Sequence, residues 1–428
     1  MSEASAAETP KSGGPFSWWF GVTLWKRILL AVILGAIVGY FWGPSAEQIK
    51  WIGDIFVRLI RMIVVPLVFL TLVAGVAAMG DLRRLGSIGV KAIFLYMLTS
   101  FFAVAIGVGV GVVLQPGVGV DIAGAEPSEV STSVSIGEQL MNIIPLNPIA
   151  ALASGDMLAI IFFAILVGAG LLVAGERVRP LAAVFDQASD VMLGATRIVM
   201  EVAPFGVFAL IAWVMGTSGP QAFINVFLLA IGVYGGCLLH MLLVQGGLVR
   251  LLANLPAFRF FRDITAAQLV AYSTSSSAAT LPVTIRVAEN NLGIKTPVAS
   301  SVLPLGATVN MDGTALYVAL VALFSAQVFG VPLGLADYGV IMLTTVLVSI
   351  GAASVPSASL FLLAAVLTAI GISPEQTALV VGFILPFDRI LDMMRTATNV
   401  TGDLAVATTV AKWENEIDMD EFRAKSHS

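Results

Sequence analysis

The chain has 428 residues, of which 58% are hydrophobic and 11% are charged, and its formal net charge is −5. Soluble globular domains have about 45–50% apolar and about 25% charged residues, so this composition excludes an ordinary soluble protein and indicates a polytopic protein in a lipid bilayer. The small net charge argues against a polyanionic partner, and we expect no nucleic acid. Cys237 is the only cysteine, which excludes an intrachain disulfide and a metal site built on several thiolates.

The first 14 residues, MSEASAAETPKSGG, are small and polar, and we interpret them as a cytoplasmic tail rather than a signal peptide. Apolar runs long enough to cross a bilayer follow. The predicted spans are residues 18–42, 51–79, 88–114, 149–174, 180–215, 222–249 and 298–328. Every second connection carries Lys or Arg, whereas residues 117–147 carry acidic residues and no Lys or Arg. The positive-inside rule therefore predicts a cytoplasmic N-terminus.

Glu201 and His240 are ionisable residues inside these apolar spans that need individual interpretation. Glu201, close to Pro204 in a helix that we expect to be kinked, could carry a proton or cap freed backbone groups, and we favour the structural interpretation. His240 lies on an apolar face, and we interpret it as a hydrogen-bonded packing residue rather than a ligand.

A short motif occurs twice in the second half of the chain. Residues 275–282 read SSSAATLP and residues 349–356 read SIGAASVP, each in the middle of an apolar stretch. A Ser-rich segment with a proline cannot continue a helix there, and irregular backbone at membrane depth is tolerated only where it lines a cavity. We predict two re-entrant helical hairpins that enter from opposite sides, the pattern of an inverted-repeat secondary transporter.

The apolar run between the two motifs contains GATVNMDGTALY. Asn310 and Asp312 are two residues apart and would point to opposite sides of a regular helix, yet a buried Asp needs partners close to it. An unwound segment, with Gly313 permitting the break, solves this and supplies oxygens suited to a hard monovalent cation. Tyr96, Thr99 and Ser100 share one face of the third span.

The last apolar run carries the strongest charge pattern. At about 100° per residue, five polar residues fall within about 80° of the helical wheel. They are Asp388, Asp392, Arg395, Asn399 and Asp403. Burying charge in a bilayer costs at least about 2.5 kcal/mol per residue, so this stripe must face protein, water or ligand. Three carboxylates against one Arg leave room for cations.

Together, TSSSAATLP, NMDGTALY, SIGAASVP and LDMMRTATNVTGD resemble the glutamate transporter family of dicarboxylate/amino acid:cation symporters, from about residue 18 to 413. The resemblance implies an all-α polytopic membrane protein with eight transmembrane helices plus two re-entrant helical hairpins, built as inverted repeats. It also implies a homotrimer with an elevator mechanism. The implied parts are a cytoplasmic tail (1–17), a scaffold domain (18–86 and 117–217), a transport domain (87–116 and 218–416) and a C-terminal cytoplasmic tail (417–428).

The resemblance also implies roles for individual residues. Asp392 would bind the substrate amino group, and Arg395 would bind its side-chain carboxylate as a bidentate fork. The rest of the substrate pocket would comprise Ser276, Ser277, Met311, Thr314, Val355, Thr396 and Asn399. We also expect Ser359, where this chain departs from the family, to contact the substrate through its hydroxyl. Three sodium sites would use Gly306, Asn310, Asn399 and Asp403; Thr308, Ser349, Ile350 and Ala352; and Tyr96, Thr99, Ser100, Asn310 and Asp312.

Three departures from the family pattern affect these expectations. The second hairpin has Ser354, Ser357 and Ser359 around its proline, where the family usually has glycine, so the gate's flexibility or the polarity of the pocket changes. Position 275 is Ser where some prokaryotic members have Arg, and Arg389 could supply that positive charge. Val318 stands where proton- and potassium-coupled members have Glu, which argues against a family-type proton carrier.

We therefore expect a symporter, not an enzyme, that takes up acidic amino acids with co-transported sodium ions. L-Aspartate is the foremost expected substrate and L-glutamate the second. The alternatives within the family are a C4-dicarboxylate or a neutral amino acid carrier, and the alternative from another class is an ion channel. We expect a multi-pass protein of the cell inner membrane with both termini in the cytoplasm.

Overall fold

The structure of the chain is a computed structural model, which describes residues 24–78, 86–120, 144–155, 157–349 and 359–419, together with Val22 and Phe422. Within these ranges every regular element is helical, and the β-structure is limited to an isolated antiparallel bridge between Ile294 and Ile417. Among the described residues, five helical stretches are long and apolar enough to cross a membrane: Lys26–Phe56, Ser87–Leu114, Ala159–Met200, Val226–Leu252 and Thr296–Val328. The all-helical membrane class predicted from the sequence is thus observed.

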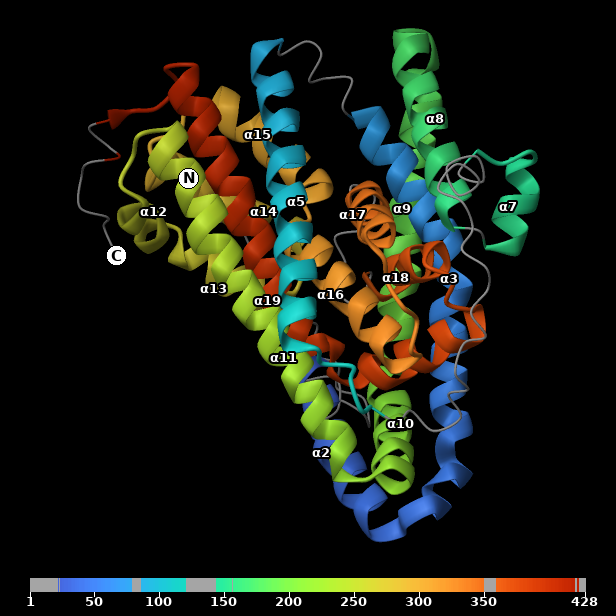
Figure 1. Cartoon of the computed structure of the whole chain (residues 1–428). Helices are drawn as coiled ribbons and strands as arrows, with labels where there is room; N and C mark the ends of the chain where they lie inside the picture. The colour runs from blue at the N-terminus through green and yellow to red at the C-terminus, as the bar shows by residue number, and fades with distance from the viewer. Residues whose placement is uncertain are drawn as a thin grey trace, which may run out of the picture.

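Apart from α5, the helices from the first half of the chain pack mainly on one another, as Figure 1 shows in blue and green. This group comprises α2 (Leu24–Trp42), η1 (Gly43–Ile49), α3 (Lys50–Ala78), α7 (Pro148–Ser154), α8 (Met157–Ala174), η2 (Gly175–Val178), α9 (Arg179–Met200) and α10 (Ala203–Ser218). Their outer faces expose large apolar side chains such as Phe41 and Val173, which are 82% and 83% exposed. Such surfaces suit lipid rather than water.

Two of the predicted spans are each divided into two helices. Residues 180–215 form α9 and α10, which are separated at Glu201 and Val202. Pro204 lies in the first turn of α10, because proline lacks the backbone N–H that would continue α9 but fits the start of a new helix. Residues 149–174 form α7 and α8, since Gly155 ends α7 in the left-handed region at φ 75°.

Glu201, at the break between α9 and α10, forms an ion pair with Arg27 of α2. Arg27 Nη1 lies 2.7 Å from Glu201 Oε2, and Arg27 Nη2 lies 3.2 Å from Oε1, so the guanidinium engages both oxygens. This geometry supports the structural interpretation of Glu201, although its partner is a distant arginine rather than freed backbone groups.

We expect Glu201→Gln to lower the free energy of unfolding by about 1 kcal/mol, because the Glu201 side chain is 42% exposed and the pair is partly screened. Thermal unfolding in detergent measures the loss of stability. Arg27→Met and the double variant Arg27→Met with Glu201→Gln complete a double-mutant cycle. If the decrease in unfolding free energy of the double variant equals the sum of the decreases of the two single variants, the ion pair contributes no coupling energy.

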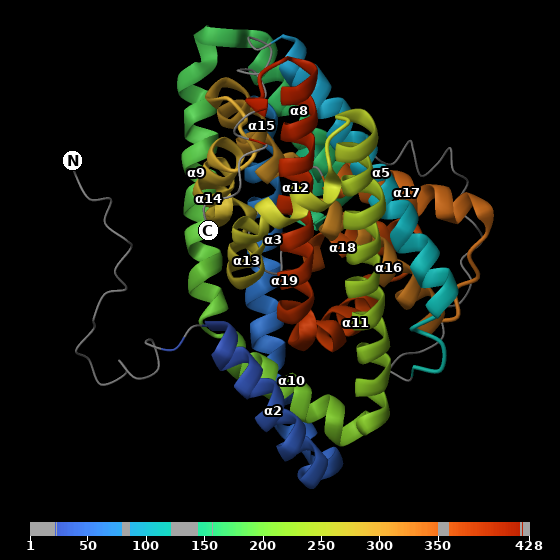
Figure 2. The same ribbon diagram turned by 90° about the vertical axis from the view of Figure 1, so that its left-hand side faces the viewer.

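Much of the second group of helices, including α11 to α15, forms the left-hand part of Figure 1, whereas α17 and α18 lie nearer to α3 and α9, and Figure 2 shows the group from the left-hand side. It comprises α5 (Ser87–Leu114), α11 (Pro220–His240), η3 (Met241–Gln245), η4 (Leu248–Leu252), α12 (Ala257–Asp263), α13 (Thr265–Thr274), α14 (Ser277–Asn290), α15 (Thr296–Val309), α16 (Asp312–Val328), α17 (Leu335–Ser349), α18 (Ser359–Ala369) and α19 (Pro374–Trp413). Both η3 and η4 are π-helical.

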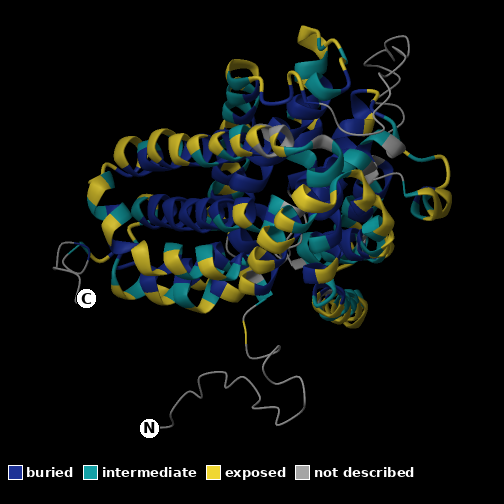
Figure 3. Ribbon diagram, turned by 90° about the horizontal axis from the view of Figure 1, so that it is seen from below, coloured by how far each residue is buried: buried dark blue, intermediate teal, exposed yellow. Residues whose placement is uncertain are grey.

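Helix α16 forms the centre of this group. Its residues from Asp312 to Ala326 are all buried, and α5, α11, α17, α18 and α19 pack around it. The dark-blue interior in Figure 3 contrasts with the yellow outer faces of the surrounding helices. A helix that is apolar on all sides belongs in such a position, because every face has an apolar neighbour.

Helix α19 supports the polar stripe predicted from the sequence. Ser373 and Gln376 form a capping box, and Pro374 is the first helical residue, so the start of the helix is strongly specified. The helix has 40 residues, which corresponds to about 60 Å at about 1.5 Å per residue. Such a length lets the helix present its polar residues at several levels of the second group.

The two repeated motifs lie where pairs of short helices join. The expectation that a Ser-rich segment with a proline cannot be helical is wrong for most of the first motif, because residues 277–282 form the start of α14 with Pro282 inside the helix, where proline removes only one backbone hydrogen bond. Helices α13 and α14 pack together, and the chain turns between them at Ser275, in the left-handed conformation with φ 51°. The second motif lies between α17 and α18, which also contact each other, but residues 350–358 at its tip lie outside the described residues.

Candidate functional site

The polar stripe of α19 faces the interior of the second group. Asp388 and Arg395 are fully buried, and Asp392, Asn399 and Asp403 are 7%, 3% and 2% exposed. A regular helix brings these residues to one face because their spacing follows its period, as the sequence predicts. Neighbouring helices α5, α11, α13, α15 and α16 all contact α19.

Arg395 is held by two carboxylates and an aromatic ring. Its Nη2 donates to Asp392 Oδ1 at 2.8 Å, and its Nη1 lies 3.0 Å from Asp388 Oδ1. The guanidinium carbon stands 3.9 Å from the ring centroid of Tyr317, a cation–π contact. The cation is thus oriented and charge-compensated in a buried position, where a planar anion could exchange with one of its carboxylate partners.

Asp388 and Tyr317 are site residues to which the sequence analysis gave no individual role. Within the described part of the chain, Asp388 pairs with Arg395 as an ion pair, and Tyr317 places its ring against the same guanidinium. Asp388 was visible only as a member of the stripe. Tyr317 lies on the helix opposite, so its contact with Arg395 depends on packing that no local pattern reveals.

The predicted unwound segment separates α15 from α16. Asn310 has φ −93° and ψ 87°, and Met311 has φ −112° and ψ 50°, both outside the helical region. The break turns Asn310 and Asp312 toward a common interior. Met311 Sδ accepts a hydrogen bond from Asn399 Nδ2 at 3.3 Å, so the segment also contacts the stripe.

Gly313 plays a different part from the one expected. It lies within α16, beyond the break, and its backbone N donates to Asn399 Oδ1 at 2.7 Å. A Cβ at this position would come within 2.4 Å of the Arg395 carbonyl oxygen. Glycine is therefore needed for the close approach of α16 to α19, and not for the break itself.

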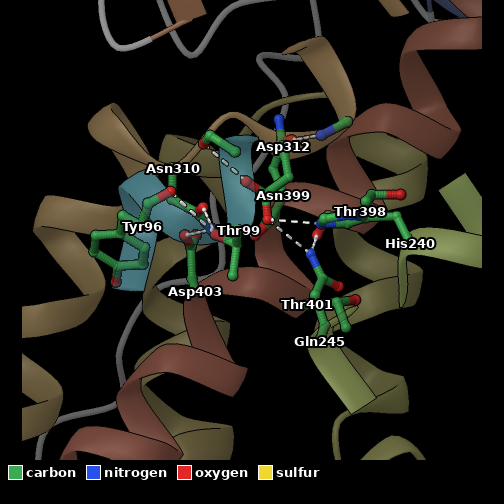
Figure 4. A network of polar contacts seen from close by, with 12 residues as sticks. Tyr96, Thr99, His240, Gln245, Asn310, Asp312, Thr398, Asn399, Thr401 and Asp403 are labelled. Carbon is green, nitrogen blue, oxygen red and sulfur yellow. Dashed lines mark hydrogen bonds and ion pairs between the residues drawn. The ribbon is translucent and has the colours of Figure 1, made fainter. Parts of the chain in front are cut away.

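A buried network of oxygens surrounds the break, as Figure 4 shows. Asn310 Nδ2 donates to Asp403 Oδ1 at 3.0 Å and to the Asn399 carbonyl at 3.3 Å. From α5, Thr99 Oγ1 donates to Asn310 Oδ1 at 3.3 Å, and Ser100 Oγ donates to Asp312 Oδ1 at 2.9 Å. Carboxylate, amide, hydroxyl and carbonyl oxygens in one enclosure provide the ligand set that a hard cation prefers.

The remaining residues expected around this network take up varied positions. Tyr96 is buried, with its hydroxyl donating to the Val302 carbonyl at 3.0 Å, and Gly306 lies beside it, such that a Cβ there would meet Asp403 Oδ1 at 2.5 Å. Thr308 is exposed on α15, and Ser349 is buried at the end of α17. Ile350 and Ala352 lie outside the described residues.

His240 and Gln245 of the α11 region join the network from the opposite side. His240 Nε2 lies 3.0 Å from Asp312 Oδ2, and Gln245 Nε2 donates to the same oxygen at 3.1 Å. His240 is thus a hydrogen-bonded interior residue, as its sequence context suggested, but its partner is an expected cation ligand. Nothing in the sequence pointed to Gln245.

The residues expected around a substrate lie near the Arg395 end of the stripe or on the hairpin-like segments. Thr314 and Thr396 are buried on α16 and α19. Ser276 caps α14 by accepting from the Ala279 N, while the hydroxyls of Ser277 and Ser359 are buried without a hydrogen-bond partner in the described part. Val355, Ser354 and Ser357 lie outside the described residues.

Arg389 adds a second guanidinium close to the α13–α14 turn. Its Nη2 donates to the Thr274 carbonyl at 3.3 Å, whereas Nε and Nη1 are buried and have no hydrogen-bond partner among the described residues. Buried donors of a cation are costly unless an acceptor reaches them. The turn thus combines a cation, free hydroxyls and the N-terminus of a helix, which together favour an anion.

Comparison with known proteins agrees with this chemistry. The model of the sodium:dicarboxylate symporter family matches residues 24–413. The chain is 36% identical over 402 residues to the proton/sodium-glutamate symport protein of Geobacillus stearothermophilus, covering 91% of this chain and 94% of that protein. It is 36% identical over 413 residues to the proton/glutamate-aspartate symporter of Escherichia coli, covering 92% and 93%.

A third relative is named for a different substrate. The C4-dicarboxylate transport protein of Azorhizobium caulinodans is 36% identical over 409 residues, covering 94% of this chain and 91% of that protein. The family match extends over the break, the polar stripe and both repeated motifs. The chain therefore belongs to the sodium:dicarboxylate symporter family and is a membrane transporter, not an enzyme.

Proposed function

We propose that this symporter takes up acidic amino acids, L-aspartate foremost and L-glutamate second, together with sodium ions. The observation that carries the proposal is the buried pair of Asp392 and Arg395, whose nitrogen and oxygen lie 2.8 Å apart. A substrate with an ammonium and a distal carboxylate can replace this internal ion pair by two others, because its ammonium can pair with Asp392 and its carboxylate with Arg395. A C4-dicarboxylate has no ammonium to offer Asp392.

The second carboxylate of such a substrate also needs a counter-charge. We assign it to the α13–α14 turn, where the N-terminus of α14 presents backbone N–H groups and Arg389 has two buried nitrogens without a hydrogen-bond partner among the described residues. Ser276, Ser277, Met311, Thr314, Val355, Ser359, Thr396 and Asn399 would complete this pocket.

Sodium is proposed as the coupled ion because the network around the break supplies neutral oxygens with few carboxylates. One site would use Gly306, Asn310, Asn399 and Asp403, and another would use Tyr96, Thr99, Ser100, Asn310 and Asp312. A third would use Thr308, Ser349, Ile350 and Ala352. Sodium would be a co-transported substrate rather than a resident cofactor. Relatives named proton/sodium-glutamate symporters make proton coupling the competing possibility.

The proposed mechanism is an elevator in a homotrimer of the cell inner membrane, with both chain termini in the cytoplasm. The first group of helices would be the static scaffold, and the second group the moving transport domain. This division is supported by the packing, since each group makes most of its contacts within itself. The segment between α17 and α18 would act as the gate.

Uptake into proteoliposomes tests the proposal. We expect labelled aspartate and glutamate to accumulate when sodium is higher outside, whereas serine and succinate should not. The competing function is C4-dicarboxylate transport, for which the relative from Azorhizobium caulinodans is named. It predicts uptake of succinate instead. Accumulation driven by a proton gradient in sodium-free buffer would show that the coupled ion has been assigned wrongly.

A further inference from the structure

Helix α11 changes its geometry at His240. The α-helix ends there, and Met241–Gln245 and Leu248–Leu252 are π-helical, within the continuous apolar stretch Val226–Leu252. Turns with i to i+5 hydrogen bonds are rare, and they frequently occur at functional sites. No proline lies in this stretch to force the change. The altered turn therefore needs another explanation.

The π-turn brings His240 and Gln245 to the same place. In an α-helix, residues five apart are about 140° from one another, because each adds about 100°. A π-turn holds nearly one residue more, so five residues come close to a full turn. His240 Nε2 and Gln245 Nε2 accordingly reach the same atom, Asp312 Oδ2, at 3.0 and 3.1 Å.

The hydrogen bonds from His240 and Gln245 hold one oxygen of the Asp312 carboxylate, Oδ2, and leave Oδ1 to the α5 side. Gln245 Nε2 also donates to the Thr398 carbonyl on α19 at 3.0 Å, and both His240 and Gln245 are completely buried. Oδ2 is thereby committed to the α11 region. Oδ1 accepts a hydrogen bond from Ser100 Oγ on α5 at 2.9 Å. Figure 4 shows His240 and Gln245 on one side of the network and Thr99 on the other.

We propose that His240 and Gln245 are positioning residues that set the affinity of the sodium site at Asp312. By holding Oδ2, they stop the carboxylate from rotating and direct Oδ1 toward Thr99, Ser100 and Asn310. They also compensate the burial of the carboxylate with hydrogen bonds, as partners behind metal ligands commonly do. The inference rests on the proposed role of Asp312 as a sodium ligand.

The test compares variants that remove or keep the donor. His240→Leu and Gln245→Met remove it at similar volume, whereas His240→Gln keeps an N–H donor. The readout is the sodium midpoint, which is the sodium concentration that gives half of the sodium-induced rise in melting temperature without aspartate. We expect this midpoint to increase about tenfold in His240→Leu and Gln245→Met. His240→Gln should stay within about threefold of the unmodified protein. Aspartate affinity at saturating sodium should change less than twofold.

Tyr234→Phe provides the matched control, because Tyr234 lies on α11 and hydrogen-bonds Tyr272 and the Ile390 carbonyl, away from Asp312. An unchanged sodium midpoint in His240→Leu and Gln245→Met would overturn the inference. So would an equal shift in His240→Gln and His240→Leu, since the donor would then not matter. If His240→Leu does not fold, Gln245→Met and His240→Gln decide the question by the same criteria.

Asp312→Asn and the unmodified protein separate this inference from the proposed function. If the unmodified protein shows no response to sodium, or if Asp312→Asn keeps the full response, the sodium-ligand assignment fails and the positioning role fails with it. If Asp312→Asn weakens the response to sodium while His240→Leu and Gln245→Met do not alter it, only the positioning role is wrong.

Discussion

Replacing Arg395 with cysteine is expected to abolish aspartate transport, with a loss of binding free energy of about 2–5 kcal/mol. This corresponds to a decrease in affinity from about 30-fold to several thousand-fold. The substrate's distal carboxylate would enter a buried site without its bidentate partner, so most of the loss is the cost of an unpaired charge. Serine, which has no such carboxylate, should bind relatively better. Binding calorimetry with aspartate and serine measures both effects.

The same substitution should also weaken folding, because Asp388 and Asp392 would lose their cation. A buried charge that loses its partner costs about 3–5 kcal/mol, and Asp388 is fully buried with Arg395 Nη1 at 3.0 Å. The double variant Arg395→Cys with Asp388→Asn should recover thermal stability without recovering aspartate binding. Arg179→Cys, at an arginine side chain that is 78% exposed, is the control. Aspartate affinity that is unchanged in Arg395→Cys would refute the substrate assignment.

Features that depend on one continuous helix were predictable from the sequence. The stripe of α19 follows from its spacing alone, and its burial follows from the cost of charge in lipid. The break at Asn310 was predictable for a similar reason. Two polar residues on opposite faces of a helix cannot share a buried site unless the helix unwinds.

Features that depend on helix ends or unusual turns were harder to predict. Hydrophobic runs such as 180–215 do not show where a helix stops, and only Pro204 hinted at the boundary between α9 and α10. The π-turn of α11 leaves no mark on hydrophobic periodicity, so the convergence of His240 and Gln245 was hidden. Their contacts with Asp312 span 72 and 67 positions of the chain, far beyond any local pattern.

The packing of α19 against the network leads to a final prediction, at Gly402. A Cβ there would lie 2.6 Å from Asn310 Nδ2, 2.8 Å from Gln245 Nε2 and 3.0 Å from Asp312 Oδ2. Ends of side chains can often move, but Asn310 and Gln245 are each tied by hydrogen bonds on two sides. The methyl group would therefore displace groups at the centre of the proposed sodium site.

Gly402→Ala should thus reverse the usual effect of this substitution. Alanine in a helix interior is normally more stable than glycine by about 1 kcal/mol, but overpacking costs about 1–3 kcal/mol. We expect a lower melting temperature and, because the proposed ligands are displaced, at least a tenfold higher half-saturating sodium concentration. Gly382→Ala is the matched control on the same helix, since a Cβ there meets nothing within 4 Å. It should leave the response to sodium unaltered and keep or raise stability. If the two variants behave alike in both measurements, the network around Asn310 and Asp312 is not closely packed around a cation, and the proposed sodium site must be placed elsewhere.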